Sequence, residues 1–125
     1  MREIEFRAKA VGDGVWVYGD LHIKAKTPHI HDCFARSVHI DPATVGQYTG
    51  LKDRNGTKIY EGDIIKLDSF NPPLFVVDFV EGAFCLKQDD DGYYTDIHYV
   101  QHAGINQAEV IGNIHDNPEL IKKGE

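Results

Sequence analysis

The chain has 125 residues, which fits one domain and leaves no room for two ordinary ones. Hydrophobic residues make up 42% and charged residues 26%, a balance that excludes disorder as the dominant state. The formal net charge of −7 opposes non-specific nucleic-acid binding, because that binding depends on Lys and Arg neutralising phosphates.

Strand patterns dominate the chain from its first residues. Ile4, Phe6 and Ala8 alternate with charged residues, which is typical of a strand with one buried face. The next apolar and β-branched segments are separated by turn residues rather than by helical spacing. Strands are therefore predicted at residues 3–9, 15–24, 29–31, 37–40, 64–67, 74–80, 83–87, 93–100 and 109–114.

Turn residues separate these strands. The strongest local signal is Asn55-Gly56, because this pair adopts positive φ at low cost and so favours a tight reversal with Gly56 at positive φ. Further turns are predicted at residues 12–14, 61–63, 81–82 and 89–92. Asp41-Pro42 and Asn117-Pro118 each place a capping residue before Pro, which predicts two short helical turns.

Short strands joined by Gly-containing turns predict an all-β fold, a small barrel or sandwich. From about residue 60 onward the strands are numerous enough to close as an SH3-like barrel. We expect one core there, formed by Ile64, Leu74, Val76, Phe84, Ile111 and Ile114.

Compartment follows from cysteine usage and hydropathy. Cys33 and Cys85 are too few for a secreted disulfide framework, and the N-terminal residues lack the apolar stretch of a signal peptide. No run approaches the roughly 20 apolar residues of a membrane helix. We therefore expect a cytoplasmic protein without a membrane partner, with both thiols reduced.

Three sequence stretches resemble the YopX family of phage and prophage proteins. They are MREIEFRAK followed by VYGDL, the long block VGQYTGLKDRNGTKIYEGDII at residues 45–65, and EVIGNIHDNPEL at residues 109–120. The resemblance implies one domain over residues 1–125, with an N-terminal β region at residues 1–47 and an SH3-like barrel at residues 48–125. It transfers no catalytic residue. Its motif residues are expected to be structural: Tyr48, Thr49, Gly50, Asp53, Gly56, Tyr60, Glu61, Gly62, Asp63, Gly112 and Asn113.

The carboxylates of the long block have two interpretations. Asp53, Glu61 and Asp63 could serve acid–base chemistry or hold a divalent cation. Alternatively Asp53 stabilises a turn and Asp63 caps a bend. No nucleophile lies at a matching spacing, which favours the structural interpretation.

A histidine-rich segment offers candidate metal ligands. His29, His31 and Cys33 alternate, so on one extended strand they share a face and could ligate zinc. His22 or His39 could complete the site if the strands pair suitably. Three ligands along one flat strand converge poorly, however. We therefore expect no cofactor, and we predict that purified protein holds no stoichiometric zinc at His29, His31 and Cys33.

Two further sequence patterns, an acidic run and a set of aromatic residues, could suggest ligand binding. Asp89-Asp90-Asp91-Gly92 lacks the distal Glu of a calcium loop and is taken as a hairpin tip. An aromatic set could stack single-stranded nucleic acid, although its neighbours are not basic; it comprises Tyr93, Tyr94, Tyr99, Phe79 and Phe84.

The absence of phosphate loops, catalytic triads and nucleotide fingerprints favours a non-enzymatic protein that binds another protein. The resemblance to the YopX family implies that it is a phage-derived accessory protein. The alternative is a small barrel that binds nucleic acid. A third hypothesis is a metal-dependent enzyme using the histidine-rich segment. Homo-oligomerisation stays open.

Overall fold

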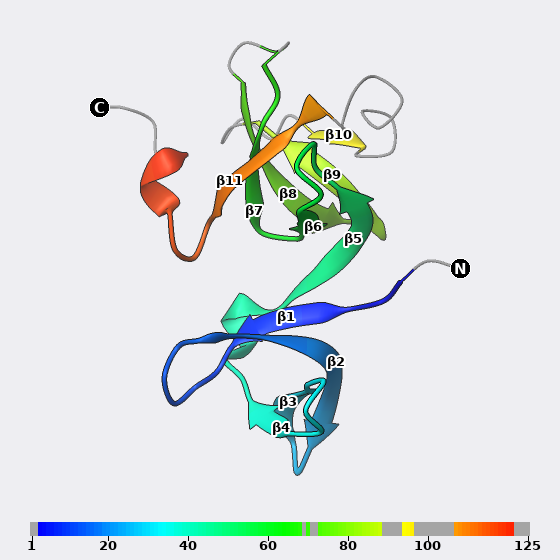
Figure 1. Ribbon diagram of the computed structural model, residues 1–125, viewed down its shortest axis with the longest axis vertical. Coiled ribbons are helices and arrows are strands. Elements are labelled where there is room, and N and C mark those ends of the chain that lie inside the picture. Colours follow the sequence, from blue (N-terminus) through cyan, green and yellow to red (C-terminus); the bar gives the residue numbers. More distant parts are fainter. Residues whose placement is uncertain (1–2, 69, 71–72, 89–93, 97–106, 122–125) are drawn as a thin grey trace. The chain divides into compact units, whose positions relative to one another are not determined.

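A computed structural model describes residues 3–68, 70, 73–88, 94–96 and 107–121. These residues form short antiparallel strands and two brief 3-10 turns, so the fold is all-β, as the sequence predicts. The chain divides into two compact units, Met1–Gly50 and Leu51–Glu125, here called unit 1 and unit 2 (Figure 1).

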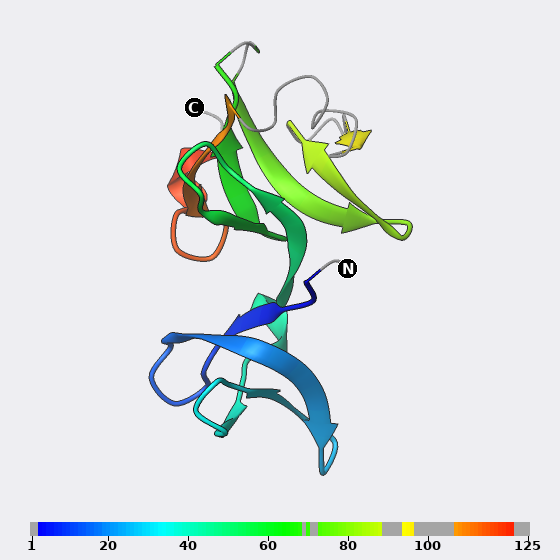
Figure 2. The same ribbon diagram turned by 45° about the vertical axis from the view of Figure 1, so that its right-hand side comes forward.

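Unit 1 is a curled antiparallel sheet. Its strands are β1 (Phe6–Lys9), β2 (Trp16–Lys24), β3 (Thr27–His31), β4 (Ser37–His39) and the start of β5 (Gly46–Lys52). They are hydrogen-bonded in the order β4-β3-β2-β1-β5, and Figure 2 shows β2 curving over β3 and β4. A bridge between Ala10 and Ile40 joins the chain just beyond β1 to the chain just beyond β4, so the sheet curls back on itself.

The core of unit 1 lies on one face of this sheet. Ala8, Ile30 and Ile40 are fully buried, and half-buried apolar side chains pack around them. The alternation in β1 places Ala8 inside, as predicted, because successive side chains on a strand point to opposite faces. The other face of β2, β3 and β4 is therefore left to polar side chains.

Two backbone features of unit 1 carry little sequence signal. The β2–β3 hairpin turns through Ala25 and Lys26, both at positive φ (53° and 66°), without Gly or Asn. Gly19, inside β2, has φ 153°, and a Cβ there would collide with the backbone carbonyl oxygen of His31. The close approach of β2 to the end of β3 therefore requires glycine at this position.

Both predicted helical turns are present. In η1 (Pro42–Thr44) the Asp41 carboxylate accepts a hydrogen bond from the Ala43 N–H at 3.0 Å, which confirms the cap. η3 (Pro118–Leu120) also forms, but Asn117 does not cap it. Among the described residues, no helix has the length and hydropathy to span a membrane.

Unit 2 contains a five-stranded sheet in the order β10-β9-β8-β7-β11, with β6 hydrogen-bonded to β5. The predicted strands from residue 64 onward are confirmed to within two residues, and of the predicted strand 93–100 the structure describes the part in β10. The strands are β6 (Lys58–Tyr60), β7 (Asp63–Lys66), β8 (Leu74–Val80), β9 (Ala83–Lys87), β10 (Tyr94–Asp96) and β11 (Glu109–Asn113).

The core of unit 2 differs from the predicted one. Phe84 belongs to it and Ile64 is fully buried, but the other four predicted residues are only half-buried: Leu74, Val76, Ile111 and Ile114. The buried cluster is Ile59, Ile65, Leu67, Phe75, Val77, Phe84, Leu86 and Ala108.

The error has a physical cause in each strand. In β8 the predicted core residues Leu74 and Val76 share their strand face with Asp78, and the structure buries the other face, at Phe75 and Val77. In β11 the register shifts between Val110 and Gly112, and such a bulge re-aims the side chains that follow it.

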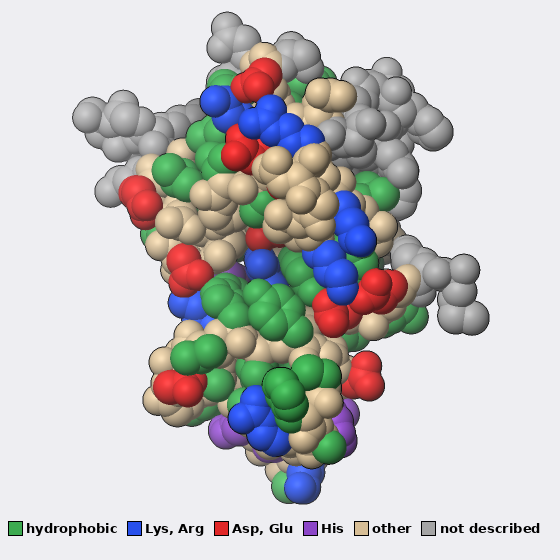
Figure 3. All heavy atoms as spheres, viewed as in Figure 1, with side chains coloured by type: hydrophobic (Ala, Val, Ile, Leu, Met, Phe, Trp, Pro, Cys, Tyr) green, Lys and Arg blue, Asp and Glu red, His purple; other side chains and the backbone are tan. Residues whose placement is uncertain are grey.

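Charge is unevenly divided between the units. Residues 1–50 contain six Lys or Arg and six Asp or Glu, whereas residues 51–125 contain seven and fourteen, so the whole net charge of −7 belongs to unit 2. On the face drawn in Figure 3, Lys and Arg side chains alternate with Asp and Glu side chains.

Candidate functional site

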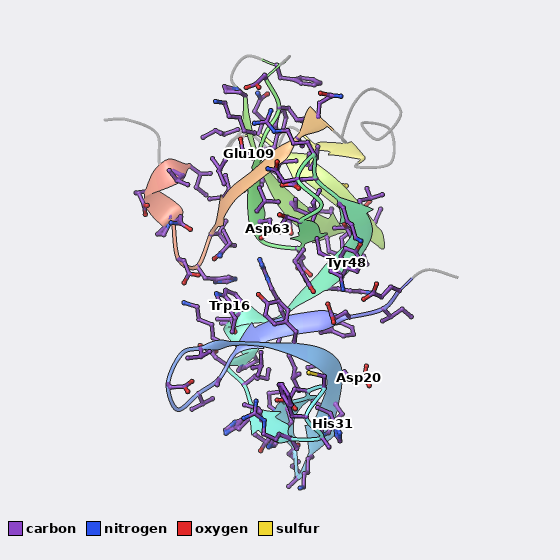
Figure 4. The ribbon with its side chains drawn as sticks, viewed as in Figure 1. Trp16, Asp20, His31, Tyr48, Asp63 and Glu109 are labelled. Carbon is purple, nitrogen blue, oxygen red and sulfur yellow. The ribbon has the colours of Figure 1, made fainter. Side chains whose placement is uncertain are left out.

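A cluster of histidines lies on the polar face of the β2–β3–β4 sheet. His22 is opposite His29, which is opposite His39, and Asp20 is opposite His31, which is opposite Ser37. Ring centroids are 5.8 Å apart for His22 and His29, 5.3 Å for His29 and His39, and 6.4 Å for His22 and His31. We call this set the histidine face: Asp20, His22, His29, His31, Ser37 and His39. Figure 4 labels two of them, Asp20 on β2 and His31 on β3.

Hydrogen bonds orient two of these rings. Nδ1 of His29 lies 3.0 Å from the Thr27 carbonyl oxygen. Because a carbonyl only accepts, Nδ1 is the donor in this bond, and in the neutral imidazole Nε2 then carries the lone pair. Nε2 of His22 lies 3.3 Å from the Ser37 hydroxyl. The rings are half-buried or exposed, so solvent reaches the face.

The predicted alternation of His29, His31 and Cys33 is wrong at Cys33. β3 ends at His31, and Cys33 lies exposed in the following loop rather than on the strand face. The strand ends there because the Asp32 carboxylate accepts hydrogen bonds from the N–H groups of Phe34 and Arg36 and bends the chain. Instead, strand pairing brings His22 and His39 beside His29.

The loop 32–36 is tightly organised around Asp32. One carboxylate oxygen accepts the N–H groups of Phe34 and Arg36 at 2.9 and 3.0 Å, and the other accepts Nε of Arg36 at 2.9 Å. The Arg36 guanidinium also lies 5.3 Å from the Phe34 ring centroid. Phe34 nevertheless remains 74% exposed. The loop is thus a rigid turn that presents a large aromatic side chain to solvent.

The ionisation of Asp32 reinforces this loop. Burial raises the pKa of its carboxyl, but the hydrogen bonds donated by Arg36 and Phe34 and the Arg36 charge outweigh burial and lower the pKa below its usual value. Asp32 therefore stays ionised at neutral pH and holds the loop through charge-assisted hydrogen bonds.

Asp53 plays a similar role in unit 2. Its carboxylate accepts hydrogen bonds from the N–H groups of Asn55 (2.8 Å), Thr57 (2.9 Å) and Val110 (2.9 Å). The first two stabilise the reversal between β5 and β6, where Gly56 has φ 81°, which confirms the predicted turn. The third bond ties this reversal to β11.

The environment of Asp53 favours its ionised form. Burial raises the pKa of this carboxyl, but the three backbone donors and the adjacent Arg54 charge outweigh that effect and lower the pKa. Arg54 also forms a salt bridge of 2.8 Å with Glu109, labelled in Figure 4 on β11. The Asp53 loop is therefore fastened to β11 twice.

The Asp63 carboxylate is likewise hydrogen-bonded to a backbone N–H group. The Asp63 side chain is buried, with 1% of the residue exposed, and its carboxylate accepts a hydrogen bond from the Tyr60 N–H at 2.7 Å. Between these residues, the backbone of Gly62 donates its N–H to the Val77 carbonyl and accepts the Ile114 N–H at its own carbonyl. Half-buried Glu61 lies in the same turn. These contacts use the Asp53 and Asp63 carboxylates as structural acceptors.

The remaining motif residues lie at turns and pairings. Tyr48 and Thr49 are buried in β5, where the Tyr48 N–H donates to Glu5, and Gly50 has positive φ. Beyond Gly112, the Asn113 carboxamide oxygen accepts the N–H groups of His115 and Asp116, which turns the chain after β11.

The predicted aromatic platform is only partly within the described residues. Phe84 is buried in the core of unit 2, so it is unavailable for stacking. Phe79 is 45% exposed and packs edge-on against it, with centroids 4.9 Å apart. Tyr93, Tyr99, the Tyr94 side chain and the predicted hairpin tip 89–92 lie outside what the structure describes.

A second aromatic group was not anticipated from the sequence. Trp16 of β2 lies beside β1, with the Arg7 guanidinium 4.6 Å and the Lys9 ammonium 5.5 Å from a Trp ring centroid. The alternation of β1 already put both cations on one face, but only the pairing of Lys9 with Trp16 places them at the ring.

The described residues contain no preformed metal site that would support the hypothesis of a metal-dependent enzyme. Within the described ranges, no three His, Cys, Asp or Glu side chains are arranged as they stand to hold one metal ion. The histidine face and the Phe34 loop are thus solvent-facing features of unit 1, and the motif carboxylates of unit 2 support turns. Fold and site together define a two-unit, all-β protein.

Comparison with known proteins assigns the family. Residues 5–122 match the family described as YopX protein, so the chain belongs to the YopX family. It is similar to the solved protein EF1440 from Enterococcus faecalis, with 23% identity, a TM-score of 0.56, and coverage of 98% of this chain and 100% of that chain. At this identity the likeness concerns the fold alone. No curated protein matches.

Proposed function

We propose that this YopX protein is a non-enzymatic module that binds another protein through the loop 32–36 of unit 1. The observation that carries the proposal is the exposure of Phe34, 74% of whose surface meets solvent although the surrounding loop is held by Asp32. An isolated exposed apolar residue is ordinary, but a large aromatic on a rigid turn has the features of an interface anchor.

Rigidity is what makes this loop suited to binding. Ordering a flexible loop on association opposes binding, and here the Asp32 hydrogen bonds have already ordered it. Arg36, with 65% of its side chain exposed, stands beside Phe34 and supplies a second residue type enriched at hot spots. A partner pocket that is apolar and rimmed by hydrogen-bond acceptors fits this pair.

A non-enzymatic role is consistent with the carboxylates of unit 2. Asp53 and Asp63, the residues most suited by sequence to acid–base work, accept backbone N–H groups that stabilise turns. The cytoplasm of a phage-infected or prophage-carrying bacterium, and the SH3-like barrel, are parts of this proposal that rest on the motif resemblance.

The test is affinity capture from phage-infected or prophage-carrying cells with four baits: wild type, Phe34→Ala, Arg36→Ala and the control Ile23→Ala. Ile23 is 67% exposed in the same unit but lies in β2, away from the loop. A partner held by wild type and by Ile23→Ala should be lost with Phe34→Ala. With purified partner, Phe34→Ala should weaken binding by at least about tenfold. Equal capture by all four baits would refute the proposal.

Nucleic-acid binding is the second candidate, and the cluster of Trp16, Arg7 and Lys9 favours it. Unit 1 has balanced charge, so the acidic surface of unit 2 does not oppose binding locally. Trp16 is the only tryptophan, so its fluorescence reports on this cluster directly. Quenching by a single-stranded oligonucleotide, reduced by salt and by Lys9→Ala, would support this candidate; unchanged fluorescence would exclude stacking at Trp16.

A further inference from the structure

Three imidazoles of the histidine face lie close together on β2 and β3: the His22 ring contacts those of His29 and His31. His29 and His31 alternate on β3 and share a face, with Cα atoms roughly 6–7 Å apart. The His22 ring lies 5.8 Å from the His29 ring and 6.4 Å from the His31 ring, measured between centroids. The arrangement is a triangle, whereas three residues along one strand would form a line.

The His22–His29 separation matches a shared metal ion, and the His22–His31 separation is somewhat longer. Imidazole nitrogens bind zinc and similar ions at about 2.0–2.1 Å, which places two coordinating rings about 5–6 Å apart, centre to centre. The His22 and His29 planes are now near-parallel, at 18°, so their nitrogens do not yet converge. The rings are half-buried or exposed, and metal binding requires them to rotate about their side-chain bonds until their nitrogens converge.

Two independent features prepare the triangle for a metal. The hydrogen bond from Nδ1 of His29 to the Thr27 carbonyl leaves the Nε2 lone pair free to coordinate, and metal-bound histidines characteristically donate their other N–H in this way. Asp20 lies opposite His31 in register and so on the same sheet face, which makes its carboxylate the candidate for a fourth ligand.

We propose that His22, His29 and His31, together with Asp20, bind a divalent late first-row transition-metal ion. Imidazole-rich sites suit copper, nickel and zinc, and Cu²⁺ is held most tightly of these. His39 is left out of the proposed ligand set because, among the described residues, its ring contacts that of His29 alone, whereas the His22 ring contacts those of both His29 and His31. The proposed site differs from the set His29, His31 and Cys33, for which we predict no stoichiometric zinc, because Cys33 lies in the loop after β3 and His22 and Asp20 come from β2.

The test is a calorimetric titration of metal-free, full-length protein with Cu²⁺ at neutral pH. Wild type should bind one ion per chain. His22→Gln and His31→Gln should each weaken binding by at least about tenfold, since even second-shell substitutions cost 10–100-fold. His39→Gln is the matched control, because its ring is as close to His29 as that of His22 but lies beyond the triangle. His115→Gln, in unit 2, should have no effect.

Paramagnetic resonance of the bound Cu²⁺ provides a second readout. Nitrogen hyperfine structure from three imidazoles should be lost in steps in His22→Gln and in the His22→Gln/His31→Gln double variant. Thermal unfolding without metal checks that each variant is folded. Undiminished binding by the double variant, or a loss with His39→Gln equal to that with His31→Gln, would overturn the proposal.

Discussion

Replacing Asp53 tests whether one carboxylate fastens the β5–β6 reversal to β11. Asp53→Ala removes the acceptor of three backbone N–H groups, those of Asn55, Thr57 and Val110. A donor left without its acceptor costs about 1–3 kcal/mol, and these three lie in partly buried positions that water can reach. Taking the lower end for each, unit 2 should lose about 3 kcal/mol of unfolding free energy.

The Asp53→Asn substitution tests how the lost unfolding free energy is divided among the three hydrogen bonds. Its carboxamide oxygen can still accept the Asn55 and Thr57 N–H groups, but its NH₂ group then faces the Val110 N–H, donor against donor. We expect a loss of about 1–2 kcal/mol, intermediate between wild type and Asp53→Ala. Asp13→Ala is the control, because Asp13 accepts only the Val15 N–H within an exposed turn.

The assay is urea unfolding, with amide hydrogen exchange at Thr57 and Val110 to locate the change. Both amides should exchange faster in Asp53→Ala, whereas Asp53→Asn should affect mainly Val110. If Asp53→Ala costs less than about 1 kcal/mol, or if the two substitutions are equivalent, Asp53 does not act through these three bonds.

Protonation of the Asp53 carboxylate at low pH should remove the stabilisation that its three hydrogen bonds provide. The pKa of Asp53 is lowered in the folded protein, so its ionised form stabilises the fold at pH values above the ordinary Asp pKa of about 3.9. That contribution disappears as the pH falls through the lower, folded-state pKa. The stability difference between wild type and Asp53→Asn should therefore narrow below about pH 4, and a gap that widens in acid would contradict the argument.

Three further substitutions test local geometry by thermal or urea unfolding. Gly19→Ala should destabilise unit 1 by about 3 kcal/mol because its Cβ meets a backbone carbonyl of β3, whereas Gly12→Ala, with open space around it, should cost less than about 0.5 kcal/mol. Gly56→Val should cost about 1 kcal/mol or more, because a β-branched residue resists positive φ; a neutral effect would contradict the turn geometry. Phe75→Ala should cost about 3–5 kcal/mol and clearly more than Leu74→Ala, and the reverse order would mean that β8 buries its other face.

Local chemistry allowed much of this fold to be predicted from the sequence. The Asn55-Gly56 reversal and the Asp41-Pro42 turn depend on backbone preferences of the residues themselves, and both are present. The alternation of β1 correctly placed Ala8 in the core, because alternate residues of a strand share a face. It did not indicate that Arg7, on the opposite face, is also buried, against Trp16.

Where the hydrophobic pattern or the turn residues gave only a weak signal, packing and strand pairing determined the structure. In β8 the single charged residue, Asp78, marks the Leu74–Val76 face as the outer one, but the long apolar run makes this signal weak, and the structure buries Phe75 and Val77. The Ala25-Lys26 turn carries no glycine or asparagine to signal positive φ, and it is set by the pairing of β2 with β3.

The histidine face shows this division most clearly. The sequence determined that His29 and His31 share one face of a strand, since that follows from the two-residue period of any strand. It could not determine that β3 ends before Cys33, or that His22 and His39 lie on either side of His29. The end of β3 depends on local hydrogen bonds from Phe34 and Arg36 to Asp32, which the strand alternation did not reveal. The positions of His22 and His39 depend on strand register, which arises from contacts between different strands.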